Sequence, residues 1–216
     1  MNTATSFIQI KVGEKEHIER LFNLGEVYLN SVQYFKEHEN PKIGDVFEGA
    51  EIIESGKIIK YRKDLDKEKI FCMWHINSSN PIQEEYIHKI IQNTNDYIDI
   101  ELDIRSLQTM HGKDSACVII YDIKEFNNRF QNACKKANVN FIDKKIVHYY
   151  NECSKTKINN ITPFMKRSSY SSQQEIRYLI KTKSSEILKL YLGDLSDIAK
   201  LIDSNLYKIT LKEKIK

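Results

Sequence analysis

Residues 7–35 read FIQIKVGEKEHIERLFNLGEVYLNSVQYF, and this stretch sets the order of the first elements of the fold. Residues 7–12 alternate apolar and polar side chains as a strand does, whereas the apolar side chains of residues 14–24 recur at helical spacing. Gly25 stands where a helix ends in the left-handed conformation, and residues 26–35 are rich in β-branched and aromatic side chains. The stretch therefore predicts a strand, a helix, a terminating glycine and a second strand.

The rest of the chain continues this alternation. Two apolar stretches in residues 50–63 flank Ser55-Gly56, which predicts a hairpin. Residues 69–76, KIFCMWHI, contain six apolar residues in eight and no strand breaker, and they predict a central strand buried on both faces. Strands are also expected at residues 115–123, 139–150, 175–182 and 187–193, the last two as neighbours, and helices at 81–98, 122–138 and 197–204. The sequence therefore predicts an α+β fold with a mixed or antiparallel sheet.

Length and composition limit the classes of protein that fit. The 216 residues suit one domain, 1–216, and 41% hydrophobic with 29% charged residues is typical of globular proteins. We expect a cytoplasmic protein with no membrane partner, because the chain opens without a leader pattern and has no apolar run long enough to span a bilayer. The net charge of +3 permits a nucleic-acid partner without requiring one. The cysteines and histidines lack metal-ligand spacing, so no metal is expected.

The most informative motif is FMKRSSYSSQQEIR, residues 164–177. An aromatic residue and small polar residues precede Gln173 and Glu175, which lie two positions apart at the entrance to a strand and should face the same side. This pattern resembles the motif of ADP-ribosyltransferases, in which an aromatic residue precedes Gln/Glu-x-Glu. The strand, helix, glycine and strand of residues 7–35 are similar to the front of that fold. The resemblance implies an ADP-ribosyltransferase-like split sheet, mixed or antiparallel, with flanking helices.

The resemblance also implies which residues bind NAD⁺, the expected substrate. Ser31 would be the pocket serine, and Tyr34 or Phe35 would place a ring against nicotinamide. The first-strand Arg or His of the toxin and polymerase branches is absent, so Gln9 or Lys11 would take its place.

A second resemblance covers most of the chain. Its layout is similar to a broad group of uncharacterised bacterial proteins, often found in defence loci, which open with a lysine-bearing strand and a strand that ends in Phe before an acidic turn. The matching features here are Lys11, Tyr34-Phe35 and the turn GDVFEG at residues 44–49. The Glu-x-Arg of that group corresponds to Glu175 and Arg177, and we count Arg177 among the expected NAD-binding residues.

The expected chemistry explains the residue types. Cleavage of the nicotinamide–ribose bond passes through an oxocarbenium-like state, which a carboxylate stabilises, and Glu175 is the candidate catalytic residue. Relatives with Gln at the position of Gln173 modify asparagine in proteins or guanine in nucleic acid, and an amide suits either partner. Tyr170 could stack on a base. Lys166 and Arg167, with Lys155 and Lys157 upstream, form a basic patch suited to phosphates.

These features predict an NAD-dependent ADP-ribosyltransferase that acts as a toxin or antiphage effector. A nucleic acid, RNA in preference, is the expected acceptor ahead of protein, and a small antitoxin protein is implied as a partner. An NAD⁺ glycohydrolase and a non-catalytic binding module of the same fold stay open. So do simpler interpretations: Glu175 and Arg177 as a solvated strand face, His75 as a core histidine, and the turn with Asp45 and Glu48 as a loop-shaping segment.

Overall fold

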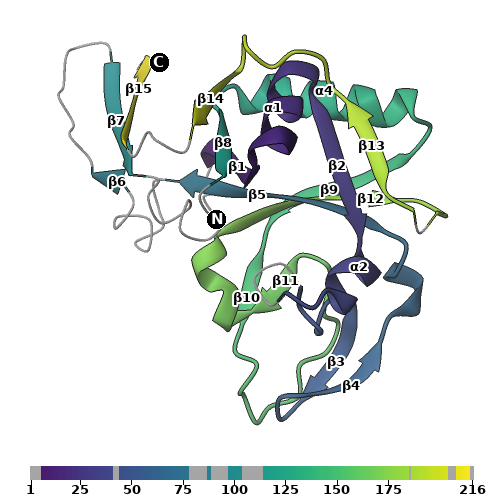
Figure 1. Ribbon diagram of the computed structural model, residues 1–216. Coiled ribbons are helices and arrows are strands. Elements are labelled where there is room, and N and C mark those ends of the chain that lie inside the picture. Colours follow the sequence, from purple (N-terminus) through teal and green to yellow (C-terminus); the bar gives the residue numbers. More distant parts are fainter. Residues whose placement is uncertain are drawn as a thin grey trace.

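The centre of the fold is an antiparallel sheet of eight strands built around β5 (Lys69–Asn77). The structure, a computed structural model, describes residues 6–40, 44–77, 87–88, 97–103, 114–184, 186–203 and 208–214. Figure 1 shows these strands with helices packed against them, and the fold is mixed α+β with mostly antiparallel sheets. The expected fold class is confirmed at this level.

The sheet branches at β5, because three strands pair with it. One edge of β5 pairs with β12 (Glu175–Lys181), which in turn pairs with β9 (Asn140–Ile146). The other edge pairs with β2 (Glu26–Ser31) at one end and with β1 (Ser6–Glu14) at the other. The sheet then continues outward through β13 (Leu188–Tyr191) beside β2, and through β8 (Ser115–Ile120) and β14 (Ala199–Asp203) beside β1. Two strands therefore share one edge of β5 and diverge from it.

Two helices pack against the strands of this sheet and form the main core with them. The helix α1 (Lys15–Leu24) ends at Gly25, whose φ of 60° and tight approach to Gly193 O leave no room for a Cβ atom. The helix α4 (Ile123–Lys136) begins at Asp122, whose carboxylate accepts the Glu125 backbone N–H. The main core contains side chains from both helices and six strands, including Ile18, Leu21, Leu29, Phe71, Met73, Val118, Phe126, Phe130 and Tyr178.

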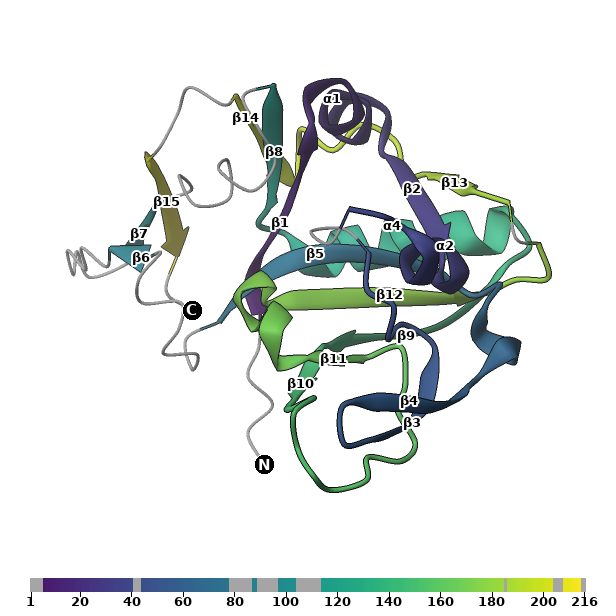
Figure 2. The same cartoon turned by 60° about the horizontal axis from the view of Figure 1, so that its bottom comes forward.

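A smaller unit lies beside the sheet and has a core of its own. It contains the hairpin β3 (Ala50–Glu54) and β4 (Lys57–Tyr61), seen below the sheet in Figures 1 and 2, and the parallel pair β10 (His148–Tyr150) and β11 (Met165–Arg167). Its hydrophobic core consists of the buried residues Ala50, Ile53, Tyr150 and Ile161. We call it the hairpin unit. The hairpin expected from Ser55-Gly56 is confirmed, with positive φ at both turn residues.

The remaining elements are short. The 3₁₀ turn η1 (Lys63–Leu65) precedes β5, and η3 (Ser168–Gln173) precedes β12. The strands β6 (Ile87–His88), β7 (Tyr97–Asp103) and β15 (Lys208–Lys214) form a separate antiparallel sheet.

Four expectations about the fold are wrong in part. The strand expected over residues 26–35 stops at Ser31 and is followed by the helix α2 (Val32–Glu37), because the Ser31 hydroxyl caps that helix. Residues 199–203 form the strand β14 rather than a helix, since the free edge of β8 pairs with them. Strand β13 pairs with β2, not with β12. Of the helix expected over residues 81–98, positions 87–88 and 97–98 lie in strands, and the rest falls outside the described residues.

Candidate functional site

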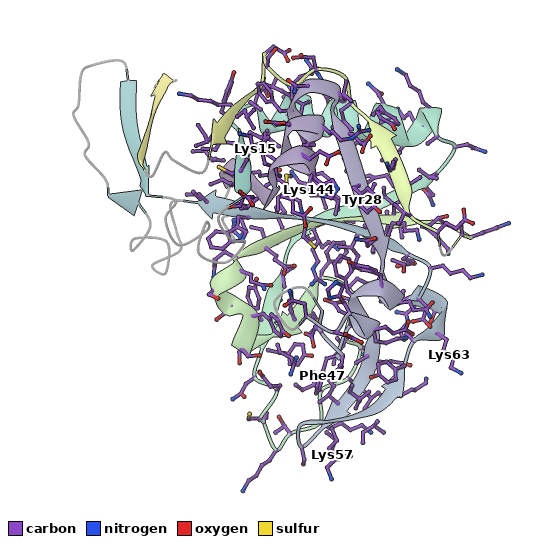
Figure 3. All side chains as sticks on the ribbon, in the orientation of Figure 1. Lys15, Tyr28, Phe47, Lys57, Lys63 and Lys144 are labelled. Atoms are coloured by element: carbon purple, nitrogen blue, oxygen red, sulfur yellow. The ribbon has the colours of Figure 1, made fainter. Side chains whose placement is uncertain are left out.

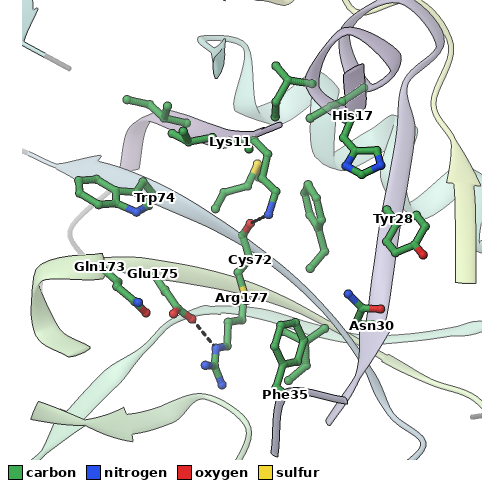
Figure 4. A pocket seen from close by; sticks show the side chains of 18 of the residues that line it. Lys11, His17, Tyr28, Asn30, Phe35, Cys72, Trp74, Gln173, Glu175 and Arg177 are labelled. Atoms are coloured by element: carbon green, nitrogen blue, oxygen red, sulfur yellow. Dashed lines mark hydrogen bonds and ion pairs between the residues drawn. The ribbon is translucent and has the colours of Figure 1, made fainter. Parts of the chain in front are cut away.

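A cleft of about 600 Å³ opens where β1 and β2 diverge from β5. β2 pairs with Lys69 and Ile70, and β1 pairs with β5 from Trp74 onward, so no described strand pairs with the edge of β5 between them. Lys11 of β1 reaches into this gap, where its Nζ donates to Cys72 O at 2.8 Å (Figure 4). The volume lies within the range of roughly 300–1,000 Å³ typical of small-molecule sites.

Glu175, the first residue of β12, lies at the floor of the cleft. Its two carboxylate oxygens are held separately. Lys166 Nζ donates to Oε1 at 2.5 Å. Arg177 Nε donates to Oε2 at 2.7 Å, as Figure 4 shows. Lys166 Nζ also donates to Gln173 Oε1 at 2.6 Å. Gln173 and Glu175 therefore meet at one ammonium group.

Arg177 links this floor to the hairpin unit. Its guanidinium forms two hydrogen bonds with the Glu48 carboxylate, at 3.1 and 2.6 Å, and donates to Pro163 O at 2.6 Å. Burial alone would lower the pKa of Arg177, but Glu175 and Glu48 raise it well above its ordinary value. Both glutamates and Arg177 are buried, so the expectation of a solvated Glu175–Arg177 strand face is wrong.

The charges around Glu175 fix its ionisation. Burial by itself would raise the pKa of this carboxyl, yet Arg177 and Lys166 together lower it to about 2. Burial also lowers the pKa of the Lys11 amine, which lies 5.0 Å from the centre of the Phe71 ring. The floor therefore holds an ionised carboxylate at neutral pH, close to three basic groups.

The stability of the protein should depend on pH through Glu175. Its pKa falls from an ordinary 4.5 to about 2 on folding, so its stabilising effect is complete above about pH 4.5 and is lost as the pH falls through 2. We expect the difference in free energy of unfolding between the wild type and Glu175→Gln to shrink from about pH 6 to about pH 3 in urea titrations. A difference that stays constant over this range would contradict the assignment.

The wall formed by β2, α1 and α2 is aromatic and polar. Tyr34 and Phe35 of α2 line it with their rings at 83° and their centroids 5.4 Å apart. His17, Tyr28 and Asn30 line it further out (Figure 4). Tyr28 and Asn30 point into the cleft because they alternate with the buried residues of β2. This wall offers flat rings and an amide opposite the charged floor.

Seven of the eleven residues expected at the site line one cleft: Lys11, Tyr34, Phe35, Lys166, Gln173, Glu175 and Arg177. Four do not. Gln9 lies in the core, where its Oε1 accepts from Tyr178 Oη at 2.9 Å, and Ser31 is the cap of α2. The other two belong to a neighbouring cluster: Arg167 pairs with Asp45, and Tyr170 donates to Gly44 O.

The expected basic patch is also rearranged. Lys166 is buried against Glu175, and the Arg167 guanidinium lies 4.4 Å from the centre of the Phe47 ring while it pairs with Asp45. Lys155 and Lys157 are exposed on a different loop. The four charges therefore do not form one surface.

Sequence reasoning missed several residues of the cleft. Glu48 was interpreted as part of a loop, and its position in the acidic turn was the one sequence feature that pointed to a role in the site. His17, Tyr28 and Asn30 had no motif, although the alternation of apolar and polar side chains in β2 could have shown that Tyr28 and Asn30 face away from the core. Trp74, considered only as a strand residue, also lines the cleft.

Comparison with known proteins does not identify the function of this site. No family model, no curated protein and no solved structure matches the chain. Within the described ranges, no cluster of three or more His, Cys, Asp or Glu side chains is arranged to hold a metal ion. No described helix has the length and apolar character needed to cross a membrane.

Proposed function

We propose that the protein is an NAD⁺-dependent ADP-ribosyltransferase that modifies a nucleic acid, RNA in preference, and acts as a toxin or antiphage effector. The observation that supports this best is the ionised, buried Glu175 at the floor of a cleft between diverging strands. A carboxylate in such a place stabilises the positive charge that develops on ribose when nicotinamide leaves.

The neighbours of Glu175 have distinct roles in this proposal. Arg177 and Lys166 fix the carboxylate by one hydrogen bond each, so its position is set before the substrate binds. The basic groups near it favour an anionic ligand, and the pyrophosphate of NAD⁺ fits that preference. Tyr34 and Phe35 supply the ring surface for nicotinamide.

The transfer step is a substitution at the ribose carbon that bears nicotinamide. The carbon–nitrogen bond to nicotinamide breaks, nicotinamide leaves with the bonding electron pair, and an acceptor nucleophile forms the new bond and loses its proton. The amide of Gln173 contacts Lys166 beside Glu175. In this proposal, Gln173 orients the acceptor. An amide pairs with a base edge as readily as with another amide, which suits guanine.

A second candidate is a non-catalytic module that binds a nucleotide. One observation favours it: both oxygens of Glu175 are already engaged by cations, which reduces the negative charge available to an oxocarbenium ion. Such a module would bind NAD⁺ without breaking it.

The test uses the wild-type protein, NAD⁺ labelled in its adenylate phosphate, and separated RNA, DNA and protein from a cell lysate. We expect label to enter the RNA fraction together with an equal amount of released nicotinamide. Label only in free ADP-ribose would show a glycohydrolase instead. Binding of NAD⁺ by calorimetry without release of nicotinamide would show the non-catalytic module.

A further inference from the structure

The hairpin unit carries a group of exposed lysines. Lys57 and Lys63 lie at opposite ends of β4 (Figure 3), and Lys155 and Lys157 lie on the loop of residues 151–160. These four side chains, which we call the hairpin lysines, form no ion pair with any described residue. Other surface cations are paired, including Lys60 with Glu51 on the hairpin itself and Arg129 with Asp197.

The loop and the hairpin form one surface because their backbones pair. Ile53 N donates to Ile158 O at 3.0 Å, and Ile158 N donates to Ile53 O at 2.8 Å. Lys155 and Lys157 are therefore held beside the hairpin rather than on a separate projection. The hydrophobic core of the hairpin unit, against which Ile158 packs, holds the loop and the hairpin together.

The nearest acid of the loop is turned inward. The Glu152 carboxylate accepts hydrogen bonds from Ser168 N and Ser168 Oγ, at 3.0 and 2.8 Å, and from Ser169 N. Burial alone would raise the pKa of Glu152, but hydrogen bonds from Ser169, from its own backbone and from Ser168 lower it to about 2. The carboxylate is held at the turn before β12, and among the described residues it forms no ion pair with Lys155 or Lys157.

Apolar side chains lie along the chain between Lys57 and Lys63. Ile59 and Tyr61 are 56% and 38% exposed, and they share the outward face of β4 with Lys57 because side chains alternate along a strand. Val46, which is 55% exposed, lies next to Tyr61, whose hydroxyl donates to Val46 O at 2.9 Å. Unstacked bases pack on such surfaces while lysines contact the phosphates.

We propose that the outer face of the hairpin unit binds single-stranded RNA and presents it to the cleft. This inference rests on the proposed function in one respect, since it names the acceptor of that reaction. The geometry connects the two sites: Glu48 belongs to the cleft, Gly49 follows it, and Arg62 N at the end of β4 donates to Gly49 O at 2.8 Å. An RNA strand bound on the hairpin unit therefore approaches Glu175 from the side of the cleft on which Glu48 lies.

The experiment measures binding of a fluorescein-labelled single-stranded RNA of about 20 nucleotides by anisotropy, without NAD⁺. The variant replaces all four hairpin lysines by Gln. We expect its affinity to fall at least about tenfold at low salt, and the slope of log affinity against log salt to decrease by up to about 3, because each phosphate contact contributes about 0.7. A duplex of the same sequence should bind more weakly to the wild type.

A matched control removes the same charge elsewhere. Lys124, Lys135, Lys136 and Lys200 are exposed on α4 and β14, and their replacement by Gln should leave the affinity within about twofold. Equal losses in both variants would overturn the proposal, as would unchanged binding in the hairpin variant or stronger binding of the duplex. Nicotinamide release by the hairpin variant, measured without RNA, separates a failure of docking from a failure of the proposed activity.

Discussion

Replacement of Glu175 by Gln is expected to lower the rate of nicotinamide release by about 10²–10³-fold. Gln keeps the size and can still accept one hydrogen bond, but it removes the charge that would stabilise the oxocarbenium-like state. Because Lys166 and Arg177 hold the carboxylate in the wild type, the variant leaves two cations without their shared partner. NAD⁺ binding should weaken less than catalysis, since those cations remain available to phosphate.

The measurement is nicotinamide release over time, with NAD⁺ affinity determined by calorimetry on the same samples. Glu125→Gln is the matched control, because Glu125 also pairs with an arginine, Arg129, but on α4 away from the residues that line the cleft. The control should keep the wild-type rate. Equal, measurable rates in a folded Glu175→Gln protein and the wild type would rule out Glu175 as the catalytic residue.

Replacement of Arg177 by Met should have the largest effect on stability, a loss of about 3–5 kcal/mol. Arg177 neutralises two buried carboxylates, Glu175 and Glu48, and Met would leave them as partly unpaired charges in a site of low solvent access. The Pro163 carbonyl would also lose a donor.

The free energy of unfolding from urea titrations measures this loss. Arg62→Met serves as the control, because Arg62 pairs with the exposed Asp64 and such pairs contribute about 0–1 kcal/mol. Glu48→Gln added to Arg177→Met should recover part of the stability, since it removes one of the stranded charges. Equal losses in the two arginine variants would show that the buried cluster contributes no more than a surface pair.

The parts of the fold that followed from sequence are those in which local pattern and tertiary contacts agree. β5 was predicted from its unbroken apolar run, and α4 from its helical spacing and its Asp122 cap. The prediction failed at residues 32–37, where the Ser31 hydroxyl made a helix from residues with high strand propensity. It failed at β14 because the edge of β8 determines the conformation there, and edge pairing leaves no local signal.

The site residues also divide into those that a local sequence pattern predicted and those that depend on distant contacts. Glu175 and Gln173 were predicted to face one pocket, and both contact Lys166, although the cause differs: Gln173 ends a 3₁₀ turn, and Gln174 adopts a left-handed conformation with φ of 38° before the strand begins. Glu48 reaches Arg177 over 129 positions of sequence, and no local pattern encodes such a contact. Lys166 was expected on the surface, because the sequence around it does not indicate whether a charged side chain is buried.

The separate core of the hairpin unit makes it a local unfolding unit. Its hydrophobic core has four buried side chains, whereas the main core unites two helices and most of the sheet, so opening of the unit should cost less free energy than global unfolding. Glu48 precedes the first strand of this unit, and each opening would release the Arg177 guanidinium from one of its two carboxylates. Amide hydrogen exchange in the hairpin and the pairing of Arg177 with Glu48 in the cleft then both report the opening equilibrium of the hairpin unit.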